Sequence, residues 1–147
     1  LRKSFASAVI TVGQIKSPRV RQKLYTLLKE LDFHLPVIRS SLAHVAQDAS
    51  IGEGTVILHQ ALVNSQSRIG ENCIINSKVL VEHECIIDSH CHIAVAAVLC
   101  GNVKVGSGTF IGAGSIVREG VSIGRNCIVG MGAHIYKDIP DGQTVTG

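Results

Sequence analysis

The chain has 147 residues and a net charge of +3; hydrophobic residues make up 46% of it, but aromatic residues only 3%. Because a globular core normally uses aromatic rings to fill wide spaces, this composition predicts a narrow interior lined by small and branched aliphatic side chains. No apolar run approaches the roughly 20 residues of a membrane span, and no basic, aromatic-interleaved patch points to nucleic-acid binding. We expect a cytoplasmic protein with no membrane and no nucleic acid among its partners.

The positive charge lies in the first part of the chain. Residues 1–41 carry eight Lys or Arg against two Asp or Glu, whereas the rest carries six against nine. The segment Ala6–Val12 predicts a strand. Ser17 followed by Pro18 predicts the cap and first residue of a helix, and Phe33–Ile38 predicts an extended segment. This order is typical of the C-terminal part of a small α/β unit, so we place a domain boundary after residue 41.

Residues 42–147 follow a six-residue repeat. From Val45, every sixth residue is Val, Ile or Leu without an insertion, and the residue four positions later is usually small. Three hexads would make one triangular coil of 18 residues with the branched residue pointing inward. The pattern predicts an all-β, parallel β-helix of about five coils. The inward positions are Val45, Ile51, Ile57, Val63, Ile69, Ile75, Val81, Ile87, Ile93, Leu99, Val105, Ile111, Val117, Ile123, Val129 and Ile135.

Two residue types fall at fixed places in the repeat. Gly or Asp recurs at intervals of 18, where we expect corners with positive φ. These residues are Gly52, Gly70, Asp88, Gly106 and Gly124. Four of the five cysteines occupy the small inward position, which predicts reduced thiols in the core. They are Cys73, Cys85, Cys91 and Cys127.

The 18-residue period predicts which residues stack. His83 lies one coil before Gly101, so an imidazole would sit beside a glycine amide, a pairing suited to a general base and an oxyanion donor. A second column holds Val95, Ala113 and Met131, just after His92. Since His92 is half a coil from His83, the two would meet only across a subunit interface, which favours a closed oligomer of three subunits.

The run from Asn76 to Cys85, followed by His92 and by Cys100-Gly101-Asn102-Val103, resembles the hexapeptide-repeat sugar O- and N-acetyltransferases. These include sialic acid O-acetyltransferases and UDP-4-amino-sugar N-acetyltransferases. The resemblance extends from about Ala6 to the end of the chain. It implies a left-handed β-helix, a homotrimer with sites between subunits, and acetyl-CoA as co-substrate without a metal. The family also carries a Gly-rich loop for the nucleotide-sugar in an N-terminal α/β unit, of which residues 1–41 match only the end.

The resemblance also implies roles for individual residues. His83 would be the general base and Glu84 would tune or orient it. His92 would contact acetyl-CoA from a neighbouring subunit, and the Gly101 amide would bind the thioester oxygen. The remaining cofactor-slot positions are Ala113 and Met131.

The implied reaction is acetyl transfer to an amine of a nucleotide-linked amino-sugar in bacterial surface-glycan synthesis, without a covalent enzyme intermediate. Three alternatives remain open at this point. One is O-acetylation of sialic acid, and another is a non-catalytic β-helix scaffold. The third is a γ-class carbonic anhydrase, which would need three convergent histidines for zinc. His83, His90 and His92 are the candidates for that set, although we expect His90 to be an ordinary surface residue.

Overall fold

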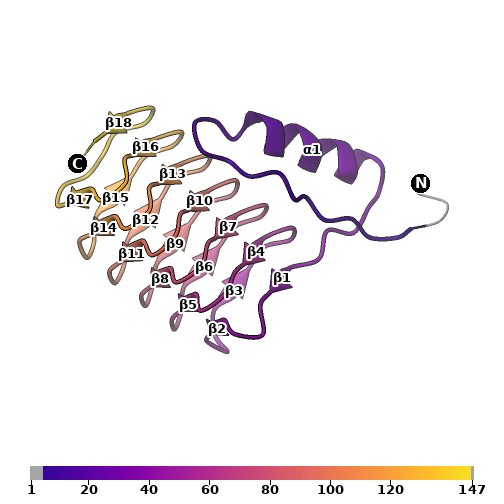
Figure 1. Ribbon diagram of the computed structural model, residues 1–147, viewed down its shortest axis with the longest axis horizontal. Helices are drawn as coiled ribbons and strands as arrows, with labels where there is room; N and C mark the ends of the chain where they lie inside the picture. Colours follow the sequence, from indigo (N-terminus) through magenta and orange to yellow (C-terminus); the bar gives the residue numbers. More distant parts are fainter. Residues whose placement is uncertain (1–4, 147) are drawn as a thin grey trace.

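The computed structural model describes residues 5–146. They form a left-handed parallel β-helix of about six turns, with one helix against its side (Figure 1). Strands pair in parallel with the strand 18 residues further on, as when His92 pairs with Phe110, except that β16 pairs with β18 at a separation of 16 residues, Ile128 with Thr144. None of the helices in this range is long and apolar enough to cross a bilayer.

The strands form three sheets, one on each face of the prism. The seven-stranded sheet contains β1 (Ile38–Arg39), β4 (Val56–Ile57), β7 (Ile74–Ile75), β10 (His92–Ile93), β13 (Phe110–Ile111), β16 (Ile128–Val129) and β18 (Thr144–Val145). The six-stranded sheet contains β2 (His44–Val45), β5 (Leu62–Val63), β8 (Leu80–Val81), β11 (Val98–Leu99), β14 (Ile116–Val117) and β17 (His134–Ile135). The five-stranded sheet contains β3 (Ser50–Ile51), β6 (Arg68–Ile69), β9 (Ile86–Ile87), β12 (Lys104–Val105) and β15 (Ser122–Ile123).

The predicted inward column forms the core. The second residue of nearly every strand is buried, and between these residues pack the small side chains of the turns. All five cysteines are free, and the four on the small inward position are buried as predicted. The aliphatic column therefore specifies the fold, because only one residue in each strand faces a narrow interior.

The solenoid has about six turns rather than the predicted five. Its first rung is β1, whose second residue is Arg39 instead of an aliphatic residue. Its last rung is β18, which pairs with β16 after an irregular stretch that contains Pro140. β1 keeps the six-residue spacing but has Arg39 in the aliphatic position, and β18 lies ten residues after β17 instead of six. The aliphatic repeat therefore reveals neither rung.

The expectation of positive φ at the recurrent Gly and Asp positions is wrong. Positive φ instead occurs two residues later in these turns, at Gly54 and Gly108 and at the non-glycine residues Asn72, His90 and Asn126. Gly52 has a different requirement: a Cβ atom there would lie 2.5 Å from the backbone nitrogen of Glu71 in the next coil. These corners favour glycine because stacked backbones approach closely.

The N-terminal part differs from the prediction in two details. The segment Ala6–Val12 is not a strand, since it makes a single parallel bridge between Ser7 and His34. The helix α1 spans Arg19–Glu30, and Pro18 is its N-cap rather than its first residue. The Ser17 hydroxyl accepts a hydrogen bond from the Arg19 N–H at 3.3 Å. Beside the early segment, His34 accepts from the Ala8 N–H and donates to the Ala6 carbonyl, both at 3.0 Å, and this one residue's pairing does not extend into a ladder.

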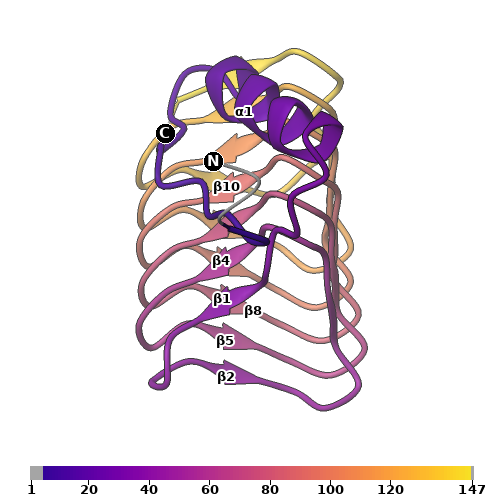
Figure 2. The same cartoon turned by 90° about the vertical axis from the view of Figure 1, so that its right-hand side faces the viewer.

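The three faces differ in what covers them. The N-terminal segment (residues 9–16) and α1 lie along the face that contains β4 and β10 (Figure 2). The outward residues of the five-stranded sheet are mostly polar. The six-stranded sheet has no such cover, yet its central strands point apolar side chains outward. We call these residues the apolar column; they are Leu62, Leu80, Val98 and Ile116.

Candidate active site

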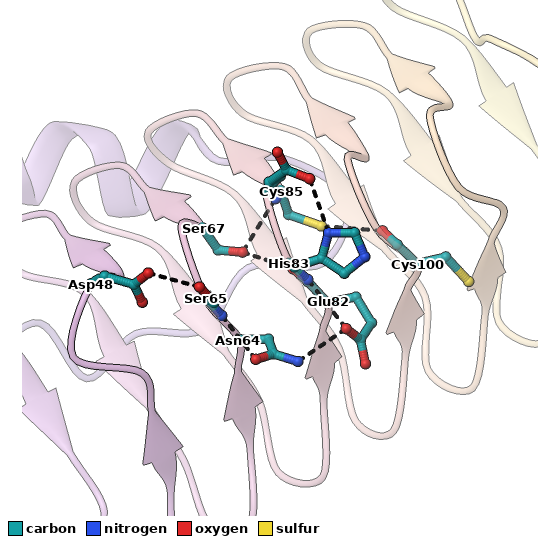
Figure 3. A network of polar contacts seen from close by, with 9 residues as sticks. Asp48, Asn64, Ser65, Ser67, Glu82, His83, Cys85 and Cys100 are labelled. Atoms are coloured by element: carbon teal, nitrogen blue, oxygen red, sulfur yellow. Dashed lines mark hydrogen bonds and ion pairs between the residues drawn. The ribbon is translucent and has the colours of Figure 1, made fainter.

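His83 lies in the turn between β8 and β9, on the prism edge that joins the six-stranded sheet to the five-stranded sheet. We call this edge, with residues 82–85 and 100–103, the His83 edge. The side chains of His83 and Glu84 are 57% and 58% exposed, and His83 Nδ1 lies 3.0 Å from Glu84 Oε2. Figure 3 shows the imidazole projecting from this turn toward the next coil.

The turn conformation lets adjacent side chains meet. Neighbours on a regular strand point to opposite faces, but Glu84 has φ of 59° and bends back toward His83. An ionised carboxylate can only accept a hydrogen bond, so it favours a proton on His83 Nδ1 and a lone pair on Nε2. Within residues 5–146, Nε2 has no hydrogen-bond partner. The pair therefore presents a free basic nitrogen to solvent.

Gly101 lies directly against this imidazole, as the column argument predicted. The Asn102 N–H donates to the His83 carbonyl at 2.8 Å, which sets the two coils in register. A Cβ atom at Gly101 would lie 2.6 Å from both Cε1 and Nε2 of His83. Across the described part of the chain, the Gly101 N–H makes no hydrogen bond. A base and an unused backbone donor thus sit side by side.

A polar network that sequence reasoning missed holds the His83 turn in place (Figure 3). Glu82 Oε2 accepts from the His83 N–H at 3.2 Å and from the Asn64 amide at 3.0 Å. The Ser67 hydroxyl donates to the Glu82 carbonyl at 2.7 Å. Asn64 lies 18 residues before Glu82, so extending the column argument to polar pairs would have found this contact.

Cys85 is close to His83 in sequence but points away from the site. Its thiol is fully buried and donates to the Cys100 carbonyl at 3.2 Å. Burial raises the pKa of Cys85 to about 11. Because the thiolate is the reactive form of cysteine, this residue is poorly placed to act as a nucleophile.

The second predicted column is also formed, on a different edge. Val95, Ala113 and Met131 stack in the turns between the seven-stranded and six-stranded sheets, which we call the Met131 edge (residues 76–79, 94–97, 112–115 and 130–133). The Gly114 N–H donates to the Val95 carbonyl at 2.9 Å, and Met131 is 78% exposed. One chain therefore does not bring this column and His83 together.

His92 points outward from β10 but is covered by the N-terminal segment, so only 7% of it is exposed. Its Nδ1 is hydrogen-bonded to the Gln14 carbonyl, and the Asn76 amide donates to Nε2 at 3.1 Å. The ring packs against Phe110 with centroids 5.2 Å apart. Burial lowers the pKa of His92, which favours the neutral ring. Since Asn76 belongs to the Met131 edge, Nε2 faces that edge.

His90 is not the ordinary surface residue that we expected. It is partly buried, its ring lies 5.5 Å from the Tyr25 ring of α1, and the Asn72 amide donates to its Nδ1 at 2.9 Å. His83, His90 and His92 therefore face three different parts of the molecule and do not converge. Among residues 5–146 there is no group of three or more His, Cys, Asp or Glu arranged to hold a metal ion.

Comparison with known proteins places this geometry in a family. A family model described as the hexapeptide repeat of succinyl-transferase matches residues 102–137. A comparison with curated protein sequences gives no match.

Solved structures resemble nearly the whole chain. The acetyltransferase domain of PglB from Neisseria gonorrhoeae, also solved with acetyl coenzyme A, is 34% identical with a TM-score of 0.92, over 96% of this chain and 67% of that one. A histidine-to-alanine mutant of GDP-perosamine N-acetyltransferase from Caulobacter crescentus, in complex with CoA and GDP-perosamine, is 31% identical with a TM-score of 0.95, over 99% and 68%. WeeI from Acinetobacter baumannii is 28% identical with a TM-score of 0.81, over 90% and 65%. The chain therefore belongs to the hexapeptide-repeat family of acetyl-CoA-dependent sugar acetyltransferases.

Proposed function

We propose that this protein transfers an acetyl group from acetyl-CoA to the amine of a nucleotide-linked amino-sugar in bacterial surface-glycan synthesis, with His83 as general base. The observation that carries the proposal is the unpartnered Nε2 of His83 packed against Gly101, whose N–H is also unused. The perosamine N-acetyltransferase, crystallised with CoA and GDP-perosamine, supports this substrate class.

The proposed transfer is direct, with His83 as proton acceptor and the Gly101 N–H as oxyanion donor. The sugar amine attacks the thioester carbonyl while His83 Nε2 takes its proton, which is general-base catalysis worth about 10²- to 10⁴-fold. The Gly101 N–H donates to the oxyanion, a contact worth about 10²- to 10³-fold. The carbon–sulfur bond then breaks, and the proton on His83 passes to the departing thiolate.

The surroundings of His83 support this sequence without a covalent enzyme intermediate. Glu84 holds the proton of the resting imidazole on Nδ1, so that Nε2 faces the substrate. The nearby thiol of Cys85 is buried and has a raised pKa, which argues against acetyl transfer through sulfur. The five free cysteines also suit a reducing compartment, and we propose that the reaction takes place in the cytoplasm.

We further propose a homotrimer whose sites lie between subunits. The apolar column of the six-stranded sheet is uncovered, and this face lies between the His83 edge and the Met131 edge. In a closed ring, each interface joins two different edges of the prism. Packing around this face would place the His83 edge of one subunit against the Met131 edge of the next, where Ala113, Met131 and His92 would contact the cofactor.

A substrate panel tests the proposed reaction. Purified protein is incubated with acetyl-CoA and either UDP-4-amino-sugars, GDP-perosamine or sialic acids, and both free thiol and product mass are measured. We expect an acetylated amino-sugar that resists hydroxylamine, because amides are stable to it whereas esters are cleaved. A hydroxylamine-labile product formed from sialic acid would replace the proposal with O-acetylation. If folded protein neither binds CoA nor turns over any acceptor, the scaffold alternative is correct.

A further inference from the structure

One buried arginine fixes the path of the N-terminal segment (residues 9–16) across the seven-stranded sheet. Arg21 of α1 is only 2% exposed. Its Nη1 donates to the carbonyls of Ile10 and Val12 in that segment, at 2.8 and 2.9 Å. Its other nitrogens donate to the carbonyls of Asn72 and Gly54 in the coils, at 3.4 and 3.3 Å. A single guanidinium therefore joins the segment to two turns of the β-helix.

Arg21 has no acidic partner to explain its burial. Within residues 5–146 no ion pair includes it, and its hydrogen bonds go to backbone carbonyls. Burial lowers the pKa of its guanidinium, although an arginine remains charged in proteins. Burying a charge costs desolvation free energy unless well-oriented hydrogen bonds offset it. Here the hydrogen bonds of Arg21 also determine where the segment lies.

Near its end the segment contacts His92, the residue predicted to contact acetyl-CoA. Gln14 is 3% exposed, and its side-chain amide donates to the His90 carbonyl at 2.9 Å. Its backbone carbonyl faces His92 Nδ1. A carbonyl can only accept, so Nδ1 must carry the ring proton and Nε2 must be the unprotonated nitrogen. The position of the segment thereby selects one tautomer of His92.

We propose that Arg21 and Gln14 are positioning residues for His92: they hold the Gln14 carbonyl against Nδ1 and so present Nε2 to the Met131 edge as a hydrogen-bond acceptor. In the structure, the Asn76 side-chain amide donates the hydrogen bond that His92 Nε2 accepts. A ligand that replaces Asn76 there must bring a donor, and an amide N–H of the pantetheine arm of coenzyme A has this chemistry. The part that concerns the cofactor rests on the proposed function.

Nitrogen-15 NMR tests the tautomer without any substrate. The variants are Arg21→Met, which removes the donors but keeps much of the side-chain volume, and Gln14→Ala, which removes only the contact with His90. Lys23→Ala is the control because it changes an exposed residue of the same helix. We expect the Nδ1–H form of His92 in wild type and Lys23→Ala, a mixture of tautomers in Arg21→Met, and a smaller change in Gln14→Ala.

Kinetics test the consequence for the cofactor. In Arg21→Met we expect KM for acetyl-CoA to rise about fivefold, the size expected from weakening one neutral hydrogen bond. KM for the sugar should be unchanged, and Arg21→Lys should restore part of the loss. If Arg21 only stabilised the fold, Arg21→Met would lower the amount of folded protein but would not raise KM for acetyl-CoA relative to KM for the sugar.

Several results would overturn the proposal. One is an Nε2–H tautomer of His92 in the wild type. Another is an unchanged tautomer in Arg21→Met when proteolysis shows that residues 9–16 are released. If Arg21→Met fails to fold by circular dichroism, Gln14→Ala decides: wild-type tautomer populations there contradict the proposal. Since the tautomer is read without turnover, an inactive wild type would count against the proposed function and not against this positioning role.

Discussion

Gly101→Ala adds one methyl group at the most crowded point of the candidate site. The φ angle of Gly101 is not positive, so alanine can adopt the same backbone. The substitution also keeps the N–H that we assign to the oxyanion. Its effect should therefore come from the contact with His83 alone.

The size of the effect follows from the distances. The new Cβ would lie 2.6 Å from Nε2 and Cε1 of His83, whereas ordinary contacts begin at 3.4 Å. The imidazole must then move by about 0.8 Å, and a misplacement of about 1 Å costs roughly 100-fold in rate. This corresponds to about 2.7 kcal/mol of transition-state free energy. We expect the loss in kcat, with KM for acetyl-CoA changed less than about threefold.

Thiol release at saturating acetyl-CoA and sugar measures kcat. Glu119→Ala is the matched control, because Glu119 occupies the same turn position one coil further on, away from His83. In the double variant Gly101→Ala/His83→Ala, the glycine change should cause no further loss, since both changes affect the same group. Wild-type kcat in Gly101→Ala, or an additive loss in the double variant, would refute the assignment of His83 as the base beside Gly101.

Three further predictions concern the partner of His83, the subunit interface and pH. Glu84→Gln retains an oxygen that can accept a hydrogen bond from His83 Nδ1 but removes the charge that stabilises the imidazolium, so kcat should fall about tenfold. Glu119→Gln is the control, and an unchanged kcat in Glu84→Gln would show that Glu84 has no role. When His83→Ala and Met131→Glu subunits are co-expressed, about a third of the interfaces in mixed trimers join two intact edges, because each mixed trimer has one such interface out of about three. Activity of purified mixed trimers should therefore return to about that fraction of the wild-type value. No recovery in verified mixed trimers would place the site within one subunit. Burial lowers the pKa of His90 and His92 from the ordinary 6.5, so the folded state binds fewer protons than the unfolded state and stability should fall as pH drops below about 6.5. Thermal unfolding between about pH 7.5 and pH 5 measures this, and an identical slope in His90→Asn/His92→Asn would contradict it.

The repeat made the fold and part of the site predictable. One inward aliphatic residue every six positions leaves only a narrow prism as a solution, and the 18-residue coil then places Gly101 against His83. The same arithmetic put Ala113 and Met131 in one column on another edge. These relations depend on backbone register, which a strict period determines.

Features outside the period could not be found in this way. The route of residues 9–16 depends on a charge, Arg21, that ordinary burial preferences would place in solvent. The burial of His92 follows from that route, and the ring of His90 is covered by Tyr25 of α1; neither has a signal of its own in the sequence. The corner glycines do not reveal which constraint acts on them, because close stacking of coils and positive φ both favour glycine, and sequence alone does not separate the two.

The most direct test of the central claim compares wild type with His83→Ala, using a nucleotide-linked 4-amino-sugar as acceptor. Thiol release gives turnover, and calorimetry gives the Kd for CoA on the same protein. We predict that kcat falls about 10³-fold, within the range for a general base, while Kd for CoA stays within about twofold. Unchanged turnover in His83→Ala, or thiol release that does not depend on the sugar amine, would contradict acetyl transfer through His83.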